Sequence, residues 1–157
     1  MEQKRLKRMR LLSGILLALY LLVLIWFLLF AESLGRSADQ GQTVRYNLIP
    51  LTEISRFWEY RDQLGLSAFT VNLIGNVLAF APLGLLMPLT FVSMRRMVPV
   101  VTAGFLLSLL AESIQLSARV GSFDVDDVLL NTCGTLLGYL FYIMCDRIRR
   151  HHNGKKI

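Results

Sequence analysis

Four long apolar runs dominate the sequence and separate its charged residues from one another. The first, Leu11–Phe30, contains no charged residue and is long enough to cross a hydrocarbon core about 30 Å thick. The others are Thr70–Val92, Met97–Leu116 and Val125–Cys145. Because a bilayer core offers no hydrogen-bond partners to the backbone, such runs have to form helices. The sequence therefore predicts an all-α, polytopic membrane protein of about four transmembrane helices, built as a single domain over residues 1–157.

The basic residues lie outside these runs, and their placement predicts the orientation. They gather in the tails 1–10 and 147–157 and, as Arg95 and Arg96, between the second and third runs. If four helices cross the membrane, all three segments face the same side, which is the positive-inside pattern. We therefore expect both termini in the cytoplasm. The pattern accounts for most of the net charge of +6 and argues against nucleic-acid binding.

The segment between the first two runs, 31–69, is predicted to face outward and to contain a short amphipathic helix. Its apolar side chains recur near helical spacing, and its charged side chains take the other face. The apolar positions are Ile54, Phe57, Trp58 and Leu64. Such a helix is typical of the headgroup zone of a membrane. The alternative is an ordinary surface helix packed on the ends of the others.

The third run carries polar residues on one helical face. Gly104, Ser108 and Glu112 are spaced by four residues, and Gln115 and Arg119 extend the same face toward the outer surface. Charged groups are costly within a bilayer, so a chain that keeps them there either uses them or needs them to hold helices together.

The start of the fourth run repeats this arrangement. Asp124, Asp127 and Asn131 share one face at spacings of three and four. Asp124 stands where a helix N-cap would be, so capping is its alternative role. Asp126 points away from this face, and we expect it to cap the helix or to face solvent.

Two glycines continue the stripe of the fourth run deeper into the membrane. Gly134 and Gly138 form a small-xxx-small pair, which allows close approach of another helix. The expected partner is the third helix, with its Gly104 and Ser108.

The second run contributes Asn76 and Pro82. Pro82 is expected to bend the helix and to free a carbonyl near residue 78. Asn76 could contact a ligand or could simply join helices by a hydrogen bond.

The polar residues of the three runs are therefore predicted to converge on an outward-facing acidic and amide pocket. Glu112 and Asp127 are the candidate catalytic residues. The candidate ligand-binding residues are Asn76, Gln115, Arg119, Asp124 and Asn131. Such a set could form a closed salt-bridge network, bind a divalent cation through oxygen ligands, or use one carboxyl group as a general acid or base. Both histidines lie in the C-terminal tail, so an enzyme would depend on carboxylate or metal chemistry.

These residues resemble the motifs of the VanZ-like family over about residues 45–140. The matching blocks are Asn47-Leu48-Ile49-Pro50, Asn72-Leu73-Ile74-Gly75-Asn76, Glu112-xx-Gln115 and Asp124-xx-Asp127-xxx-Asn131. The founding member of that family confers resistance to the glycopeptide teicoplanin without D-lactate substitution of peptidoglycan precursors. The resemblance implies a small bacterial inner-membrane protein that serves the cell envelope, and it supplies no reaction.

Three functions remain open from the sequence. The leading hypothesis is a protein of glycopeptide resistance or envelope homeostasis whose pocket engages a membrane lipid or a lipid-linked envelope precursor. The second is a carboxylate- or metal-dependent intramembrane hydrolase or transferase that acts on a lipid-linked substrate. The third is a structural or transporter-type subunit whose polar residues only hold its helices together.

Overall fold

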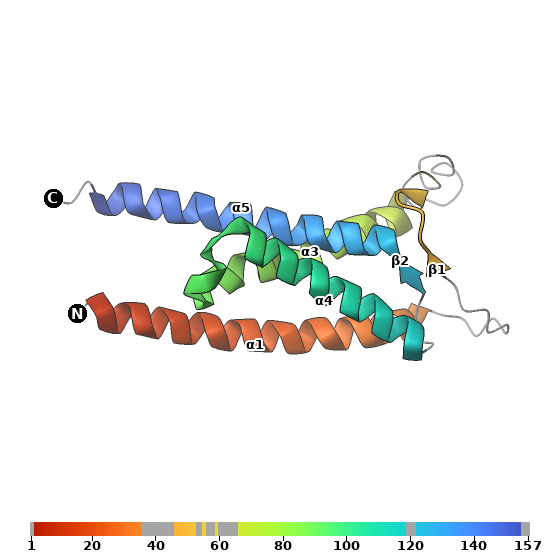
Figure 1. Ribbon diagram of the computed structural model, residues 1–157, viewed down its shortest axis with the longest axis horizontal. Helices are drawn as coiled ribbons and strands as arrows, with labels where there is room; N and C mark the ends of the chain where they lie inside the picture. Colours follow the sequence, from red (N-terminus) through yellow and green to blue (C-terminus); the bar gives the residue numbers. More distant parts are fainter. Residues whose placement is uncertain are drawn as a thin grey trace.

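The computed structural model describes residues 2–35, 46–52, 55, 59, 66–118 and 122–154. Within these ranges, four long helices run along the molecule (Figure 1): α1 (Glu2–Gly35), α3 (Leu66–Thr90), α4 (Met97–Ala118) and α5 (Val125–Gly154). A short 3-10 helix, η1 (Val92–Arg95), joins α3 to α4. Each long helix contains a segment that is long and apolar enough to cross a membrane. The predicted all-α polytopic membrane fold is confirmed.

Two helices are longer than the apolar runs that predict them. α1 begins at Glu2 and α5 continues to Gly154, whereas the runs cover only 11–30 and 125–145. The added turns are rich in lysine and arginine, which are good helix formers. The end of an apolar run predicts where a helix leaves the membrane, but α1 and α5 continue as helices beyond that point.

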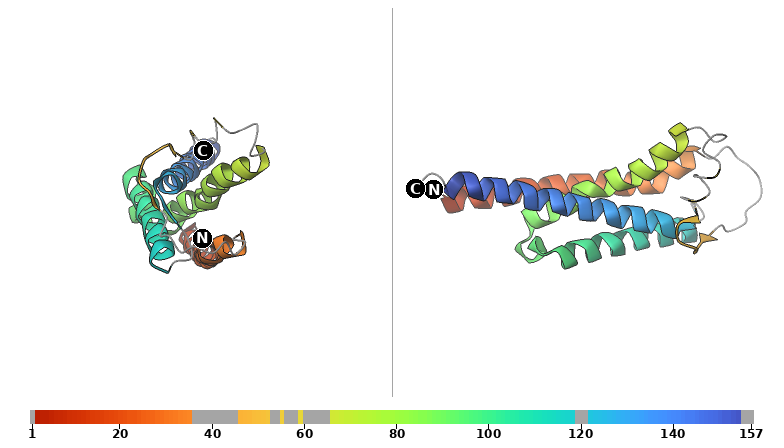
Figure 2. Two further views of the ribbon diagram at one scale, coloured as in Figure 1. Left: turned by 90° about the vertical axis from the view of Figure 1, so that its right-hand side faces the viewer. Right: turned by 90° about the horizontal axis from the view of Figure 1, so that it is seen from above.

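Helix α3 lies at the centre of the packing. It packs most extensively on α5 and also contacts α1, while α4 packs mainly on α5. Both chain termini lie at one end of the bundle, and the short strands lie at the other (Figures 1 and 2). One apolar core joins α1 to α3 through Leu17, Leu24, Phe80 and Leu83.

The glycines of α5 allow the closest helix contact in the described structure, but their partner differs from the prediction. A Cβ atom on Gly134 would lie 2.2 Å from the Val77 carbonyl oxygen, and one on Gly138 would lie 1.9 Å from the Ala81 carbonyl oxygen. Both carbonyls belong to α3, so the expectation that α4 is the partner was wrong. Helix α4 meets α5 instead where Gly104 faces the Thr135 side chain.

The prolines of α3 lie inside the helix, as the sequence predicts for Pro82. Pro82 cannot donate to the carbonyl of residue 78, so the helix is short of one hydrogen bond there. At the next residue, the Ala79 carbonyl accepts a hydrogen bond from the Tyr20 hydroxyl of α1. This bond ties α1 to the weakened turn.

Replacing Tyr20 by phenylalanine should therefore lower the free energy of unfolding by about 1 kcal/mol, because one partly buried hydrogen bond is lost while the ring remains. The measurement is thermal unfolding of the purified protein in detergent. Tyr142→Phe removes one hydroxyl from α5 and leaves the contact between α1 and α3 intact. Equal melting temperatures for the Tyr20 variant and the parent would show that the bond contributes nothing.

A small parallel strand pair closes the end opposite the termini. β1 (Tyr46–Asn47) pairs with β2 (Phe123–Asp124), with Tyr46 opposite Phe123 and Asn47 opposite Asp124. No pattern in the sequence predicted this pairing, in which Asn47 and Asp124 lie 77 positions apart along the chain. The predicted interfacial helix cannot be compared, because its apolar positions, including Trp58, lie outside the described residues.

Candidate functional site

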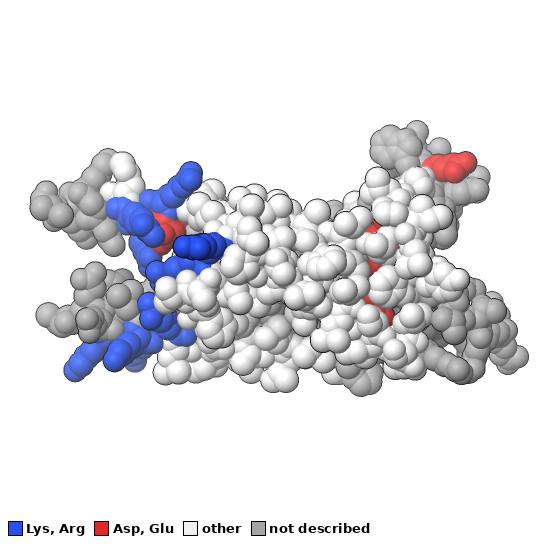
Figure 3. Space-filling view, viewed as in Figure 1, with Lys and Arg blue, Asp and Glu red and all other residues white. Residues whose placement is uncertain are grey.

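The polar residues predicted from the sequence gather at the end that carries the strands. We call this set, as far as it is described, the polar cluster: Asn76, Glu112, Gln115, Asp124, Asp127 and Asn131. In Figure 3 the acidic atoms at this end show only in part between uncharged side chains. Glu112 is 4% exposed and Asn131 is 1% exposed, so these polar groups lie within the helix packing and not on a solvated face.

Glu112 lies against the start of α5. Its Oε2 accepts a hydrogen bond of 3.1 Å from the backbone N–H of Asp124. Asp124 Oδ1 in turn accepts one of 2.8 Å from the N–H of Asp126. Since the N-terminus of a helix exposes backbone N–H groups and a partial positive charge, two carboxylates stabilise it here. The alternative role predicted for Asp124, helix capping, is confirmed.

Two side-chain hydrogen bonds tie three helices together in this layer. Asn76 of α3 donates from Nδ2 to Asp127 Oδ1 of α5 at 2.5 Å. Asn131 of α5 donates from Nδ2 to Ser108 Oγ of α4 at 2.9 Å. These bonds bring Asn76 to Asp127 and Asn131 to Ser108. The predicted polar face of α4 is buried over its described residues Gly104, Ser108, Glu112 and Gln115.

The side-chain oxygen of Asn131, Oδ1, is a buried acceptor for which the described residues provide no hydrogen bond. Leaving such an atom unsatisfied costs about 1–3 kcal/mol. A water molecule or a donor group of a ligand would remove that cost. Within the described residues, Asn131 Oδ1 is thus available as an acceptor for such a donor.

The Asn47-Leu48-Ile49-Pro50 segment docks on the start of α5. Asn47 accepts a hydrogen bond of 3.2 Å from the Ile49 N–H through its side-chain oxygen, which closes a tight turn. It also donates from Nδ2 to Asp124 Oδ1 at 3.1 Å. Leu51, which follows Pro50, has a φ of 67°, a left-handed conformation that is uncommon for a residue other than glycine. Its N–H donates to Asp126 Oδ1 at 2.5 Å.

The expectation that Asp126 could face solvent was wrong. It is 1% exposed and holds the strained Leu51 turn, so it does not face solvent. Sequence reasoning also missed Asn47 as part of the site. The sequence offered one signal for the contact at Asp126: two consecutive acidic residues at a helix start point to different faces, so a second segment can approach one of them.

Replacing Asp126 by alanine should lower the free energy of unfolding by about 1–3 kcal/mol, because the Leu51 N–H loses its acceptor and the turn loses its attachment. Asp126→Asn keeps an acceptor oxygen and should lose less. The measurement is the melting temperature in detergent. Glu59→Ala is the matched control, since Glu59 is exposed. If Asp126→Ala and the control melt alike, the turn does not depend on this carboxylate.

Arg119 lies outside the described residues, so its place in the polar cluster stays a prediction. Among the residues that the structure does describe, no group of three or more His, Cys, Asp and Glu side chains is arranged to hold a metal ion. The described part of the site offers hydrogen-bond acceptors and carboxylates, and the divalent cation considered from the sequence stays a hypothesis. The binding and catalytic roles assigned to the cluster also stay predictions.

Comparison with known proteins finds one matching family model and a similar protein from a bacterium. The VanZ/LLP1 family model matches residues 17–146. The protein named "Protein VanZ" of Enterococcus faecium is 33% identical over 153 residues, an alignment that covers 94% of this chain and 82% of that protein. No solved structure matches the chain.

Proposed function

The chain belongs to the VanZ/LLP1 family, and we propose that it acts in teicoplanin-type glycopeptide resistance or in cell-envelope homeostasis. The observation that carries the proposal is the polar cluster itself: carboxylates and amides from three helices meet, largely buried, at one end of a membrane protein. Helix association alone is a weak reason to keep carboxylates here, because each interhelical hydrogen bond contributes only about 0.6 kcal/mol while a charged group within the membrane is costly.

The proposed ligand of the cluster is a lipid headgroup or a lipid-linked envelope precursor at the outer leaflet. Such molecules carry hydroxyl and amide donors, which suit Asn131 Oδ1 and the carboxylates of Glu112 and Asp127. Asp126 and the Leu51 turn cover the same end, so they would border the ligand.

The proposed orientation places the polar cluster outside and both termini in the cytoplasm of the bacterium. It is supported by the basic side chains, which gather at the end where both termini lie (Figure 3). By the positive-inside rule that end faces the cytoplasm, and the membrane is then the inner membrane.

Cysteine labelling in intact cells tests this orientation. In a Cys133→Ala/Cys145→Ala background, Ser122→Cys should react with a membrane-impermeant maleimide and Asn153→Cys should react only after the cells are opened. Ser122 precedes β2 beside the polar cluster, whereas Asn153 lies near the end of α5. The reverse labelling pattern would overturn the orientation and the outer location of the site.

The alternative function is an intramembrane hydrolase or transferase for a lipid-linked substrate. It is favoured by one observation, the burial of the Glu112 carboxyl group beside a helix N-terminus, where a general acid or base would be shielded from water. Turnover of a radiolabelled lipid-linked precursor by the purified protein would distinguish this function from binding alone.

Expression in a teicoplanin-susceptible host tests the proposed function. The parent chain should raise the inhibitory concentration of teicoplanin several-fold over the empty vector. Immunoblotting of the membrane fraction shows whether the protein is present. Protein that is present and folded without any change in teicoplanin or envelope-stress susceptibility would contradict the proposal.

A further inference from the structure

The end of the bundle that carries both termini has a basic surface, which we call the basic end. Its exposed basic side chains come from α1, from the turn between α3 and α4, and from α5 (Figure 3). They are Lys4, Lys7, Arg8, Arg10, Arg95, Arg96, Arg147, Arg149 and Arg150. Asp146 lies among them and is already paired with Arg149 at 2.5 Å and with Arg150 at 2.7 Å. The remaining cations at this end face no described acidic side chain of the chain itself.

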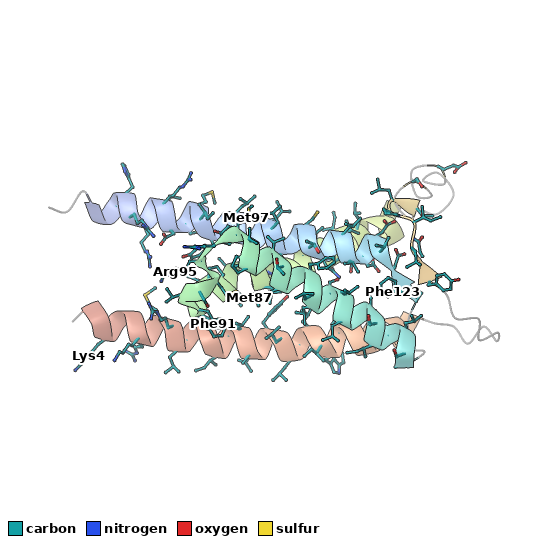
Figure 4. The ribbon with its side chains drawn as sticks, in the orientation of Figure 1. Lys4, Met87, Phe91, Arg95, Met97 and Phe123 are labelled. Atoms are coloured by element: carbon teal, nitrogen blue, oxygen red, sulfur yellow. The ribbon has the colours of Figure 1, made fainter. Side chains whose placement is uncertain are left out.

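Arg95 and Arg96 occupy a recessed position within the basic end. Gly14 of α1 lies beside the last residue of α3, since a Cβ on Gly14 would be 3.5 Å from Thr90 Cγ2. From that level α1 continues to Lys4, about 15 Å of helix. Helix α5 continues from Tyr139 to Gly154, about 22 Å. Both helix ends therefore project beyond the turn, as Figures 1 and 4 show.

The recessed turn is held in place. The Arg95 carbonyl accepts a hydrogen bond of 3.0 Å from the Tyr139 hydroxyl of α5, and the Met94 N–H donates to the Phe91 carbonyl at 3.2 Å. Two arginines on a fixed turn differ from charges on a mobile tail, because their backbone needs no ordering when an anion binds.

Apolar side chains flank the two arginines. Phe91 and Val92 precede them and are 49% and 54% exposed, and Met97 and Val98 follow them and are 49% and 68% exposed. In a bilayer these side chains face acyl chains. The turn thus presents guanidinium groups, which match the geometry of phosphate oxygens, directly beside apolar groups, which match lipid tails.

We propose that the turn carrying Arg95 and Arg96, which is set back from the ends of α1 and α5, binds the headgroup of an anionic phospholipid. The phosphate contacts the arginines of the turn, the basic residues of the projecting helix ends surround the headgroup, and the acyl chains lie against Phe91, Val92 and Met97. This site is separate from the polar cluster, which lies at the opposite end of the bundle (Figure 3).

The test is thermal unfolding of the purified full-length protein in an uncharged detergent. Phosphatidylglycerol should raise the melting temperature saturably, whereas phosphatidylcholine with the same acyl chains and soluble glycerol 3-phosphate should not. Arg95→Gln/Arg96→Gln should weaken the apparent affinity for phosphatidylglycerol about tenfold or more. Lys155→Gln/Lys156→Gln removes the same charge from the C-terminal tail and should leave the affinity within about twofold, since tail charges act only through the screened surface potential.

Three outcomes would overturn the proposal. Equal stabilisation by phosphatidylcholine would show that only acyl chains are bound. Equal loss of affinity in the tail variant would show a diffuse charge effect without a site at the turn. Stabilisation by glycerol 3-phosphate alone would show a site for a soluble phosphate. If the arginine variant does not fold, the comparison of the three ligands on the parent protein decides the question.

Discussion

Replacing Gly138 by leucine is expected to prevent folding of the bundle. A Cβ atom at this position would lie 1.9 Å from the Ala81 carbonyl oxygen, and that oxygen belongs to the backbone of α3, which cannot move aside as a flexible side chain would. Helices α3 and α5 would have to separate along their whole contact, at a cost of about 3 kcal/mol or more. The variant should be nearly absent from the monodisperse fraction after detergent extraction and size-exclusion chromatography.

Gly75 provides the matched control on the other helix of this pair. A Cβ atom on Gly75 would meet nothing within 4 Å, so Gly75→Leu adds the same side chain at a position where its first atom has open space. This variant should elute and melt like the parent. If Gly138→Leu instead matches the parent, α3 and α5 do not approach each other as closely as the structure describes.

The fold was largely predictable because a segment that crosses a bilayer can adopt few backbone structures. The four apolar runs predicted four helices, and the spacing of Gly134 and Gly138 predicted a close contact on their face of α5. The spacing could not identify the partner helix, because a repeat of four residues describes one helix only. The partner is α3, where the carbonyls of Val77 and Ala81 face the two glycines.

The site was predictable where it depended on helical spacing and unpredictable where it depended on distant contacts. Helical periodicity grouped Ser108, Glu112 and Gln115, which are all buried on α4. It could not reveal that Asp126 holds the N–H of Leu51, a residue 75 positions earlier in the chain. Such a contact depends on where a connecting segment returns to the bundle, and local patterns carry no information about that.

Replacing Glu112 by glutamine should remove function and spare the fold. Glutamine has the same shape and retains an oxygen that can accept the hydrogen bond from the Asp124 N–H. Only the charge is lost, so the melting temperature should change little while the cellular phenotype falls to the level of the empty vector. Asp127→Asn should behave in the same way, because an amide oxygen can still accept from Asn76 Nδ2.

A purely structural role for the carboxylates predicts the opposite order of effects. If Glu112 only balances a buried positive charge, its neutral variant leaves that charge uncompensated, and folding should suffer before activity does. Glu59→Gln is the control, because it neutralises an exposed carboxylate of the connecting segment between α1 and α3. It should change neither the melting temperature nor the phenotype.

The most direct test of the account is the inhibitory concentration of teicoplanin in a susceptible host, measured together with the amount of folded protein in its membrane. The comparison includes the parent, Glu112→Gln and Glu59→Gln. We predict equal amounts of folded protein in all three, with raised tolerance for the parent and Glu59→Gln and none for Glu112→Gln. Tolerance retained by a folded Glu112→Gln variant would contradict the claim that the polar cluster performs the function.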